Sequence, residues 1–219
     1  FVHDGKIYPM PIAQDHKRAF DGDKGPNTGG MGAYSPVLHI SKEVVNEAFE
    51  KVVKPTVAGM IEEGKSFTGI LYAGLILTED GVKTIEFNAR FGDPETQVVL
   101  PRLKSDLAQV IIDILAGNEP TLEWLESGVT LGVVVAAEGY PSQAKLGLIL
   151  PEILEGLNVY YAGVSKNENN QFISSGGRVY LVSETGEDVK STQKLLYEKL
   201  DKLENNGFFY RHDIGSRAI

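Results

Sequence analysis

The sequence contains no cysteine and only four histidines among its 219 residues. Disulfide bonds and thiolate metal sites are therefore excluded, because both need cysteine sulfur. The histidines are scattered along the chain and show neither the spacing of a zinc site nor that of a catalytic triad. Among them, only His16 lies within a polar segment of interest, and a hydrogen bond within that segment is its default role.

The sequence also lacks long apolar runs, internal repeats and a surplus of positive charge. No apolar run approaches the roughly 20 residues that a helix needs to cross a bilayer, and no signal peptide opens the chain. The net charge of -9 argues against a general nucleic-acid binder, because no stripe of Lys and Arg offsets it. With 42% hydrophobic and 23% charged residues, the composition predicts a globular, cytoplasmic protein without nucleic-acid or membrane partners.

The beginning of the chain is unusual. Phe1 is not methionine, and the hairpin-turn signal Asp4-Gly5 has only three residues on its upstream side. The strand expected downstream, Lys6 to Ala13, is longer than that. A strand shortened next to its own turn predicts that the chain is a fragment of a longer protein.

The most informative stretch reads I-E-F-N-A-R-F-G-D-P-E over residues 85–95. Apolar and polar residues alternate in it, so that Glu86 and Asn88 project from the same face of a strand, about 7 Å apart. A carboxylate and an amide oxygen at this spacing suit a hard cation such as Mg²⁺. Arg90 follows as a charged fork suited to phosphate or carboxylate. An ordinary solvated strand would also carry such residues.

The next residues end this strand and are expected to open a helix. Gly92 breaks the strand, Asp93 is the expected N-cap, and Pro94 suits the first helical position. The expected helix runs from Pro94 to about Leu100 and is stopped by Pro101.

A second informative segment, Gln14 to Pro36, is expected to be a long irregular loop. Its glycines free the backbone to approach a ligand closely, and its cations and short polar groups can hold an anion. These glycines, cations and short polar residues are Lys17, Arg18, Lys24, Gly25, Asn27, Thr28, Gly29, Gly30 and Gly32. The run G-P-N-T-G-G-M-G lacks the G-K-[ST] ending of a Walker A loop. A flexible surface loop remains the alternative.

The remaining pattern predicts α/β structure with a boundary near residues 117–128. Helices are expected over 41–63, capped by Ser41 and closed by Gly64, over 106–116, capped by Ser105 and closed by Gly117, and over 187–203, opened by Thr185 or Gly186. Strands are expected over 67–77, 82–88, 131–137, 158–162, 171–174 and 178–183. Trp124 is interpreted as interdomain packing and Phe208 to Tyr210 as core. Arg178 could either reach a cleft or form an ion pair.

Several segments together resemble the phosphoribosylamine–glycine ligase family, also called glycinamide ribonucleotide synthetase, of the ATP-grasp superfamily. The segments that carry the resemblance are 9–36, 69–78, 85–97, 100–107, 138–141, 175–179 and 210–215. Essentially the whole chain is covered, and it matches only the C-terminal half of that family's enzymes.

The resemblance implies a fold and a reaction. Residues 1–120 would form the C-terminal part of an ATP-grasp domain, an antiparallel sheet with flanking helices. Residues 121–219 would form a small, mainly β domain with one long helix. The implied reaction joins glycine to 5-phosphoribosylamine through a glycyl phosphate, and gives glycinamide ribonucleotide, ADP and phosphate in de novo purine biosynthesis. ATP would be the co-substrate, Mg²⁺ or Mn²⁺ the cofactor, and the missing N-terminal half the partner.

The resemblance also implies roles for individual residues. Glu86 and Asn88 fall on the family's metal ligands, and Arg90 falls near the transferring phosphate. Residues expected to contact substrate are Asp15, Lys17, Arg18, Asn27, Thr28, Gly29, Gly30, Gly92 and Asp93.

The chain also departs from the family pattern in three places. Residues 71–74 carry no acid opposite the metal strand, so a second metal would need other ligands. Residues 160–164 replace the usual F-H-A-G-T, and residues 216–218 replace W-R-A.

Two other functions remain open. One is another ATP-grasp carboxylate–amine ligase, against which the block from Asp15 to Gly32 argues. The other is a non-catalytic module that binds a phosphorylated metabolite. Because the adenine-binding half of the family's enzymes has no counterpart in these 219 residues, we expect the chain alone to be inactive.

Overall fold

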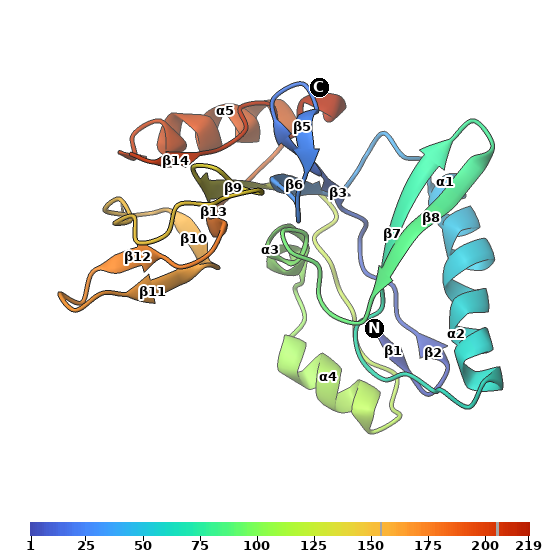
Figure 1. The fold of residues 1–219 in the computed structure, drawn as a ribbon. Helices are drawn as coiled ribbons and strands as arrows, with labels where there is room; N and C mark the ends of the chain where they lie inside the picture. The colour runs from blue at the N-terminus through green and yellow to red at the C-terminus, as the bar shows by residue number, and fades with distance from the viewer. Residues whose placement is uncertain (154, 205) are drawn as a thin grey trace. The chain divides into compact units, whose positions relative to one another are not determined.

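The computed structural model describes residues 1–153, 155–204 and 206–219. The chain forms two compact units that interleave along the sequence (Figure 1). Unit 1 comprises Phe1–Pro11, Leu38–Gly92 and Leu103–Trp124, and unit 2 comprises Ile12–Val37, Asp93–Arg102 and Leu125–Ile219. The domain division at residues 120 and 121 stays a prediction, whereas the predicted α/β class with antiparallel sheets is confirmed.

Unit 2 is built on a six-stranded antiparallel sheet. Its order is β10-β13-β9-β6-β3, and β14 also pairs with β9. The strands are β3 (Gln14–Asp15), β6 (Gly32–Ser35), β9 (Val129–Ala137), β10 (Asn158–Tyr161), β13 (Arg178–Gly186) and β14 (Phe208–Phe209). Two small hairpins accompany it, β4 (Arg18–Phe20) with β5 (Lys24–Asn27) and β11 (Val164–Lys166) with β12 (Phe172–Ser174).

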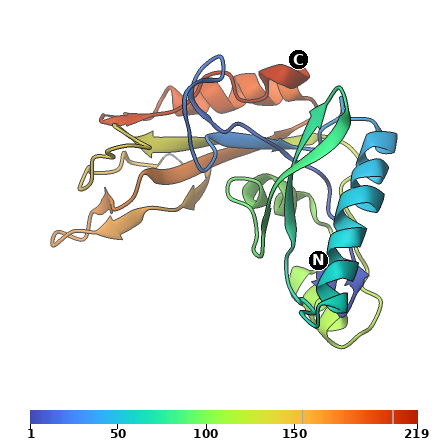
Figure 2. The same ribbon diagram turned by 45° about the vertical axis from the view of Figure 1, so that its right-hand side comes forward.

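Strand β9 is the centre of the unit 2 core. All nine of its residues are buried, as expected for a Val-rich run that is covered on both faces and paired on both edges. Helices α3 (Thr96–Val99) and α5 (Val189–Leu200) both contact β9, and they lie on opposite sides of the sheet (Figures 1 and 2). Val98 from α3 and Leu196 from α5 are fully buried.

Glycines let the backbones of this core approach each other closely. A Cβ at Gly132 would lie 3.0 Å from a methyl carbon of Val98 and 3.0 Å from one of Leu181. At Gly32, in the adjacent strand β6, φ is +156° and a Cβ would lie 2.6 Å from the carbonyl oxygen of Gly132. Strand β6 therefore needs glycine at its first position.

Unit 1 combines a long hairpin with helices. Its elements are β1 (Val2–His3), β2 (Lys6–Ile7), α1 (Lys42–Ala48), the π-helical turn η1 (Phe49–Val53), α2 (Lys54–Glu62), β7 (Tyr72–Thr78), β8 (Gly81–Asn88) and α4 (Leu107–Leu115). Phe1, Tyr8, Val110 and Ile114 form a buried cluster. Helix α1 and strand β8 are in contact, and the β7–β8 hairpin runs beside this helical segment in Figure 2.

Several predicted elements of unit 1 are confirmed. Ser41 caps α1 and accepts a hydrogen bond from the Val44 amide at 3.4 Å. Gly64, just after α2, has a φ of +70° and Gly117, just after α4, has a φ of +76°, as expected for residues that close helices. Strands β7 and β8 form the predicted antiparallel hairpin.

The prediction of an irregular segment from Gln14 to Pro36 was wrong. The segment contains four short strands, β3 to β6, and β6 is fully buried between β9 and β3. Its high glycine content suggested a loop, but Gly32 instead permits the tight strand pairing described above.

Some predicted caps and boundaries were also wrong. Asp93 is not an N-cap, because α3 begins at Thr96 and the Asp93 carboxylate accepts from the side chain of Gln97 instead. Asp106, not Ser105, caps α4, since the Ser105 hydroxyl accepts from the Glu123 amide. The final helix is α5, capped by Asp188, because pairing with β9 extends β13 through Gly186.

Two expected strands are shorter than the sequence pattern suggested. The strand expected over Lys6 to Ala13 covers only Lys6–Ile7, and the strand expected from Phe67 begins at Tyr72. Of the residues left outside these strands, Gly69 still forms an isolated antiparallel bridge with Val2.

The remaining residues singled out in the sequence have simple positions. Of the residues Phe208 to Tyr210 that were interpreted as core, Phe208 is buried in strand β14, whereas Phe209 and Tyr210 are half-buried. Trp124 forms a β-bridge with Leu103 inside unit 1. Within the described ranges, no helix combines the length and apolar character needed to cross a membrane.

Gly32→Ala is expected to destabilise the chain by about 1–3 kcal/mol, because the added methyl group would overlap the Gly132 carbonyl oxygen. Gly59→Ala is the control, since nothing lies within 4 Å of a Cβ at Gly59 in α2. This change should stabilise by up to about 1 kcal/mol. Urea unfolding followed by circular dichroism measures both. A Gly32→Ala protein as stable as wild type would contradict the tight packing of β6 on β9.

Candidate active-site residues

The predicted metal ligands lie on strand β8 of unit 1. In the ladder, Glu86 pairs with Gly74 and Asn88 pairs with Tyr72. A Cβ at Gly74 would lie only 3.1 Å from the Glu86 side chain. Strand β7 therefore places no carboxylate opposite either ligand, in agreement with the departure from the family pattern noted in the sequence.

Arg90 lies next to Asn88 in the same unit. Its Nη2 donates to the Asn88 side-chain oxygen at 3.4 Å, and its Nη1 donates to the Phe91 carbonyl at 2.8 Å. Glu86 and Arg90 are both exposed. The structure thus brings together a carboxylate, an amide oxygen and a guanidinium at the end of one strand.

The chemistry of this donor set fits Mg²⁺ or Mn²⁺. Both ligands are hard oxygens, and Mg²⁺ is commonly held by one or two protein oxygens while water and substrate phosphates complete its coordination. In the described part of the chain, no group of three or more His, Cys, Asp or Glu side chains could hold a metal ion by itself. A metal at Glu86 and Asn88 would therefore need oxygen ligands in addition to these two side chains.

The predicted substrate-contacting residues other than Gly92 lie in unit 2, around a turn at residues 28–31. The Thr28 amide and hydroxyl both donate to the Lys17 carbonyl, at 2.7 and 2.9 Å. The Gly30 amide donates to the Thr28 hydroxyl at 3.0 Å. Thr28 thus fixes this turn, which we call the glycine turn, against the segment that carries Lys17. Gly92 belongs to unit 1, where it is buried.

Asp15 is a buried carboxylate beside the glycine turn. Its side chain is 8% exposed and forms an ion pair with Lys17 at 2.9 Å, and it accepts from the His16 amide at 2.7 Å. Burial, and then the nearby Glu95 carboxylate, raises the pKa of Asp15 to about 6. At pH 7 most Asp15 side chains are therefore ionised, and the carboxylate pairs with the Lys17 ammonium at the edge of the turn.

His16 has a structural role. It is 1% exposed, and its Nε2 accepts from the Gly215 amide at 3.4 Å. Burial, followed by the charge of Arg211, lowers the pKa of His16 to about 4. The imidazole is therefore neutral at physiological pH. Its hydrogen bond joins it to Gly215 and not to the segment in which the sequence placed its partner.

The sequence left open whether Arg178 reaches a cleft or forms an ion pair, and the structure shows an ion pair with Asp93. The Arg178 Nη1 donates to the carbonyls of Gly29 and Asp93, at 3.0 and 2.7 Å, and its Nη2 pairs with the Asp93 carboxylate at 3.1 Å. Three predicted site residues, Gly29, Gly30 and Asp93, meet at this one guanidinium. The signal in the sequence was the arginine that follows Gly176-Gly177.

Arg211 is a residue that sequence reasoning missed. It is 1% exposed, pairs with Asp213 and Asp23, and donates to the Arg18 carbonyl at 3.0 Å. Arg18 itself donates to the Gly25 carbonyl at 2.7 Å. The hairpin of β4 and β5, which includes the exposed Asn27, is thus anchored to the C-terminal segment of unit 2.

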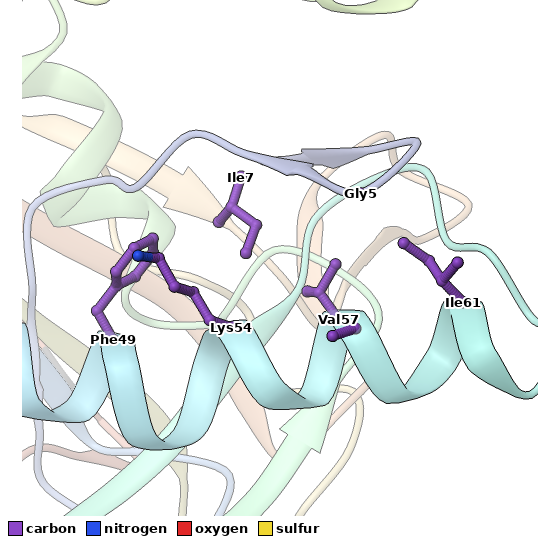
Figure 3. Close-up of a pocket in the computed structure, with 7 residues that line it drawn as sticks. Gly5, Ile7, Phe49, Lys54, Val57 and Ile61 are labelled. Atoms are coloured by element: carbon purple, nitrogen blue, oxygen red, sulfur yellow. The ribbon is translucent and has the colours of Figure 1, made fainter.

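A separate apolar cavity lies in unit 1 between α2 and the first hairpin (Figure 3). Its volume is about 370 Å³. It is lined by Gly5, Ile7, Phe49, Lys54, Val57, Ala58 and Ile61. The Lys54 ammonium lies over the Phe49 ring at 5.2 Å from its centroid. None of the predicted site residues lines this cavity.

Asp15→Asn is expected to make the free energy of unfolding less dependent on pH between about 4 and 6. A carboxyl whose folded pKa is raised to about 6 stabilises the fold fully below its ordinary pKa, and this contribution is lost as the pH rises through 6. The difference between Asp15→Asn and wild type should therefore grow by about 2–3 kcal/mol over this range.

Urea unfolding at pH 4, 5, 6 and 7 measures this difference. His16 titrates in an overlapping range with the opposite sign, because its lowered pKa removes stability as the pH falls. Its contribution is common to both proteins and cancels. A difference that stays constant from pH 4 to 6 would show that the Asp15 pKa is not raised.

Two protein-family models match the chain, one in its N-terminal part and one in its C-terminal part. The family model described as phosphoribosylglycinamide synthetase, ATP-grasp (A) domain, matches residues 1–96, and the model for the C domain of the same synthetase matches residues 130–217. Among solved structures, phosphoribosylamine–glycine ligase from Thermotoga maritima has a TM-score of 0.83 and 32% identity, over 94% of this chain and 51% of that chain.

More distant structures share the fold alone. A biotin carboxylase from Campylobacter jejuni, solved as a complex described as β-γ-ATP, has a TM-score of 0.60 and 16% identity over 85% of this chain and 41% of that one.

Curated relatives are closer in sequence and about twice as long. The chain is 97% identical over 219 residues to phosphoribosylamine–glycine ligase of Lactococcus lactis subsp. lactis (strain IL1403), and it covers 53% of that protein. It is 56% identical to the enzyme of Listeria innocua and again covers 53% of it. The chain thus spans about half the length of the relatives it matches, and it belongs to the phosphoribosylamine–glycine ligase family of ATP-grasp proteins.

Proposed function

We propose that the chain supplies the metal-binding and phosphate-binding part of a ligase that joins glycine to 5-phosphoribosylamine at the expense of ATP. In this reaction the glycine carboxylate attacks the terminal phosphorus of ATP, which forms glycyl phosphate and releases ADP. The amino group of 5-phosphoribosylamine then attacks the acyl carbon, which forms the amide of glycinamide ribonucleotide and releases phosphate. The names of the close relatives support this reaction.

The observation that carries the proposal is the arrangement at the end of β8. Glu86 and Asn88 are hard oxygen donors two residues apart on one strand, and Arg90 is hydrogen-bonded to Asn88. These residues would hold Mg²⁺ or Mn²⁺, which when bound offsets negative charge on the phosphates of ATP. Arg90 would leave Asn88 and donate to the transferring phosphoryl group, where a fixed positive charge stabilises the transition state.

In unit 2 the glycine turn would contact the anionic substrates. Backbone amides and the Lys17 ammonium can donate to phosphate or carboxylate oxygens, while Asp15 holds Lys17 in place at 2.9 Å. Arg18 and Asn27 face each other in the ladder of β4 and β5. Both residues would also contact the anionic substrates. Because Asp93 is bound to Arg178 and Gln97, its role would be to shape the turn.

The setting of the enzyme is part of the same proposal. De novo purine biosynthesis uses soluble metabolites, and a cysteine-free chain suits a reducing compartment. We therefore infer a cytoplasmic protein whose partners are glycine, 5-phosphoribosylamine, ATP and the remaining half of the same enzyme, with no nucleic acid or membrane.

Glu86→Gln and Asn88→Ala in the full-length enzyme are expected to raise the Mg²⁺ concentration for half-maximal activity at least about tenfold. Glu86→Gln replaces an anionic carboxylate oxygen with a neutral amide oxygen, and Asn88→Ala removes an oxygen ligand. Glu79→Gln is a matched control, since Glu79 is an exposed glutamate in the turn of the same hairpin. Initial rates at varied Mg²⁺ and saturating substrates measure the effect. Normal turnover and metal dependence in both variants would refute the metal assignment.

The 219-residue chain by itself is expected to form no glycinamide ribonucleotide. It spans about half the length of its relatives, and we propose that adenine binding depends on residues outside it. Product formation from glycine, 5-phosphoribosylamine and ATP, compared with the full-length enzyme under the same conditions, tests this. Turnover by the isolated chain would show that these 219 residues contain a complete active site.

A further inference from the structure

The guanidinium of Arg178 is the point where three separate segments of unit 2 are joined. Arg178 is the first residue of β13, and its side chain is 21% exposed. Its Nη1 donates to Gly29 O at 3.0 Å, Gly30 O at 3.4 Å and Asp93 O at 2.7 Å, while Nη2 donates to the Asp93 carboxylate at 3.1 Å. All four of these hydrogen bonds connect the Arg178 side chain to other residues of unit 2.

Glycine is required where this guanidinium lies on the backbone. A Cβ at Gly29 would lie 2.9 Å from the Arg178 Cζ. At Gly30, φ is +120° and a Cβ would lie 2.5 Å from Pro94 and 2.6 Å from an Asp15 carboxylate oxygen. The two glycines therefore allow a charged side chain, a proline and a buried carboxylate to enclose the turn.

Tyr140 holds the same turn through a different atom. Its hydroxyl accepts from the Gly29 amide at 3.0 Å. Its ring occupies the space that a side chain at Gly177 would need, because a Cβ there would lie 2.2 Å from a ring carbon. Both polar groups of Gly29 are thus bound, the N–H by Tyr140 and the C=O by Arg178.

We propose that Arg178, assisted by Tyr140, is a positioning residue that fixes the glycine turn and the Asp93 carboxylate in the geometry that substrate binding requires. This inference rests on the proposed ligase function and deepens it. Arg178 acts through the turn, since its donors are already directed at three carbonyls and one carboxylate. In this way the unliganded turn is held in place before the substrate binds.

The planar fork of arginine is essential to this role. Nη1 and Nη2 point in fixed, diverging directions, so that one side chain can bind the turn carbonyls and the Asp93 carboxylate at the same time. A lysine ammonium keeps the charge but lacks the second, geometrically fixed donor group. We therefore expect Arg178→Lys to impair function even though it keeps the positive charge.

The test uses the full-length enzyme with Arg178→Lys, Arg178→Met and Tyr140→Phe. We expect Arg178→Lys and Arg178→Met to lower kcat/KM for 5-phosphoribosylamine by about 100-fold, the effect of misplacing a binding group by ~1 Å. The Mg²⁺ concentration for half-maximal activity should stay at the wild-type value. Tyr140→Phe, which removes one hydroxyl, should change kcat/KM in the same direction by about tenfold. Lys194→Met is the control, since it removes only an exposed helix ion pair of unit 2.

Hydrogen exchange supplies a readout that is independent of catalysis. The amides of Gly29 and Gly30 should exchange faster in the Arg178 variants, while those of β9 keep their wild-type protection, because the Arg178 guanidinium donates to Gly29, Gly30 and Asp93. A change confined to the turn supports a positioning role, whereas loss of protection throughout unit 2 would show that Arg178 is needed for the fold as a whole.

The outcomes separate the two proposals. If the wild-type enzyme does not make glycinamide ribonucleotide, the proposed function fails. If it does, and Arg178→Lys keeps wild-type kcat/KM and Gly29 exchange, the positioning role fails while the function stands. If the Arg178 variants do not fold, Tyr140→Phe decides, and wild-type kinetics and turn exchange in that variant overturn the proposal.

Discussion

Strand β9 is the constraint on which the rest of unit 2 depends. It is buried along all nine residues, so each of its backbone polar groups must find a partner within the protein. Strand β13 satisfies one edge, and β6 and β14 share the other. Strands β10 and β3 follow from β13 and β6. The residues just outside these strands, including the glycine turn before β6, are positioned as a consequence.

The predicted site residues of unit 2 are held by this framework at its strand ends. Arg178 begins β13, the glycine turn precedes β6, and Asp93 and Pro94 precede α3, which packs on the sheet. Arg178 converts their proximity into fixed geometry, because one planar guanidinium binds groups from two of these segments at once. Burial of Asp15 beside the glycine turn also raises the pKa of its carboxyl to about 6. The packing around the turn therefore affects the charge of Asp15.

The predicted site on β8 depends on local structure. An exposed hairpin with an alternating pattern gives Glu86 and Asn88 a common face, and ladder pairing with Gly74 and Tyr72 places no carboxylate directly opposite them. The alternation of residues 84–89 suffices to predict this common face. The same reading failed for residues 14–36, where a high glycine content was taken for irregular structure, although the segment contains four short strands and Gly32 permits close packing of β6 on β9.

The sequence by itself determined the α/β class, the β7–β8 hairpin, the Ser41 cap and the family, because these depend on neighbours along the chain or on long identical motifs. Only the tertiary structure decided that Arg178 binds Asp93 and the glycine turn, that Arg211 anchors the β4–β5 hairpin, and that Asp15 is buried. Arg178 and Asp93 are 85 residues apart. Local pattern carries no information about such a pair, which forms because the segment that follows Asp93, helix α3, packs on β9 and β13.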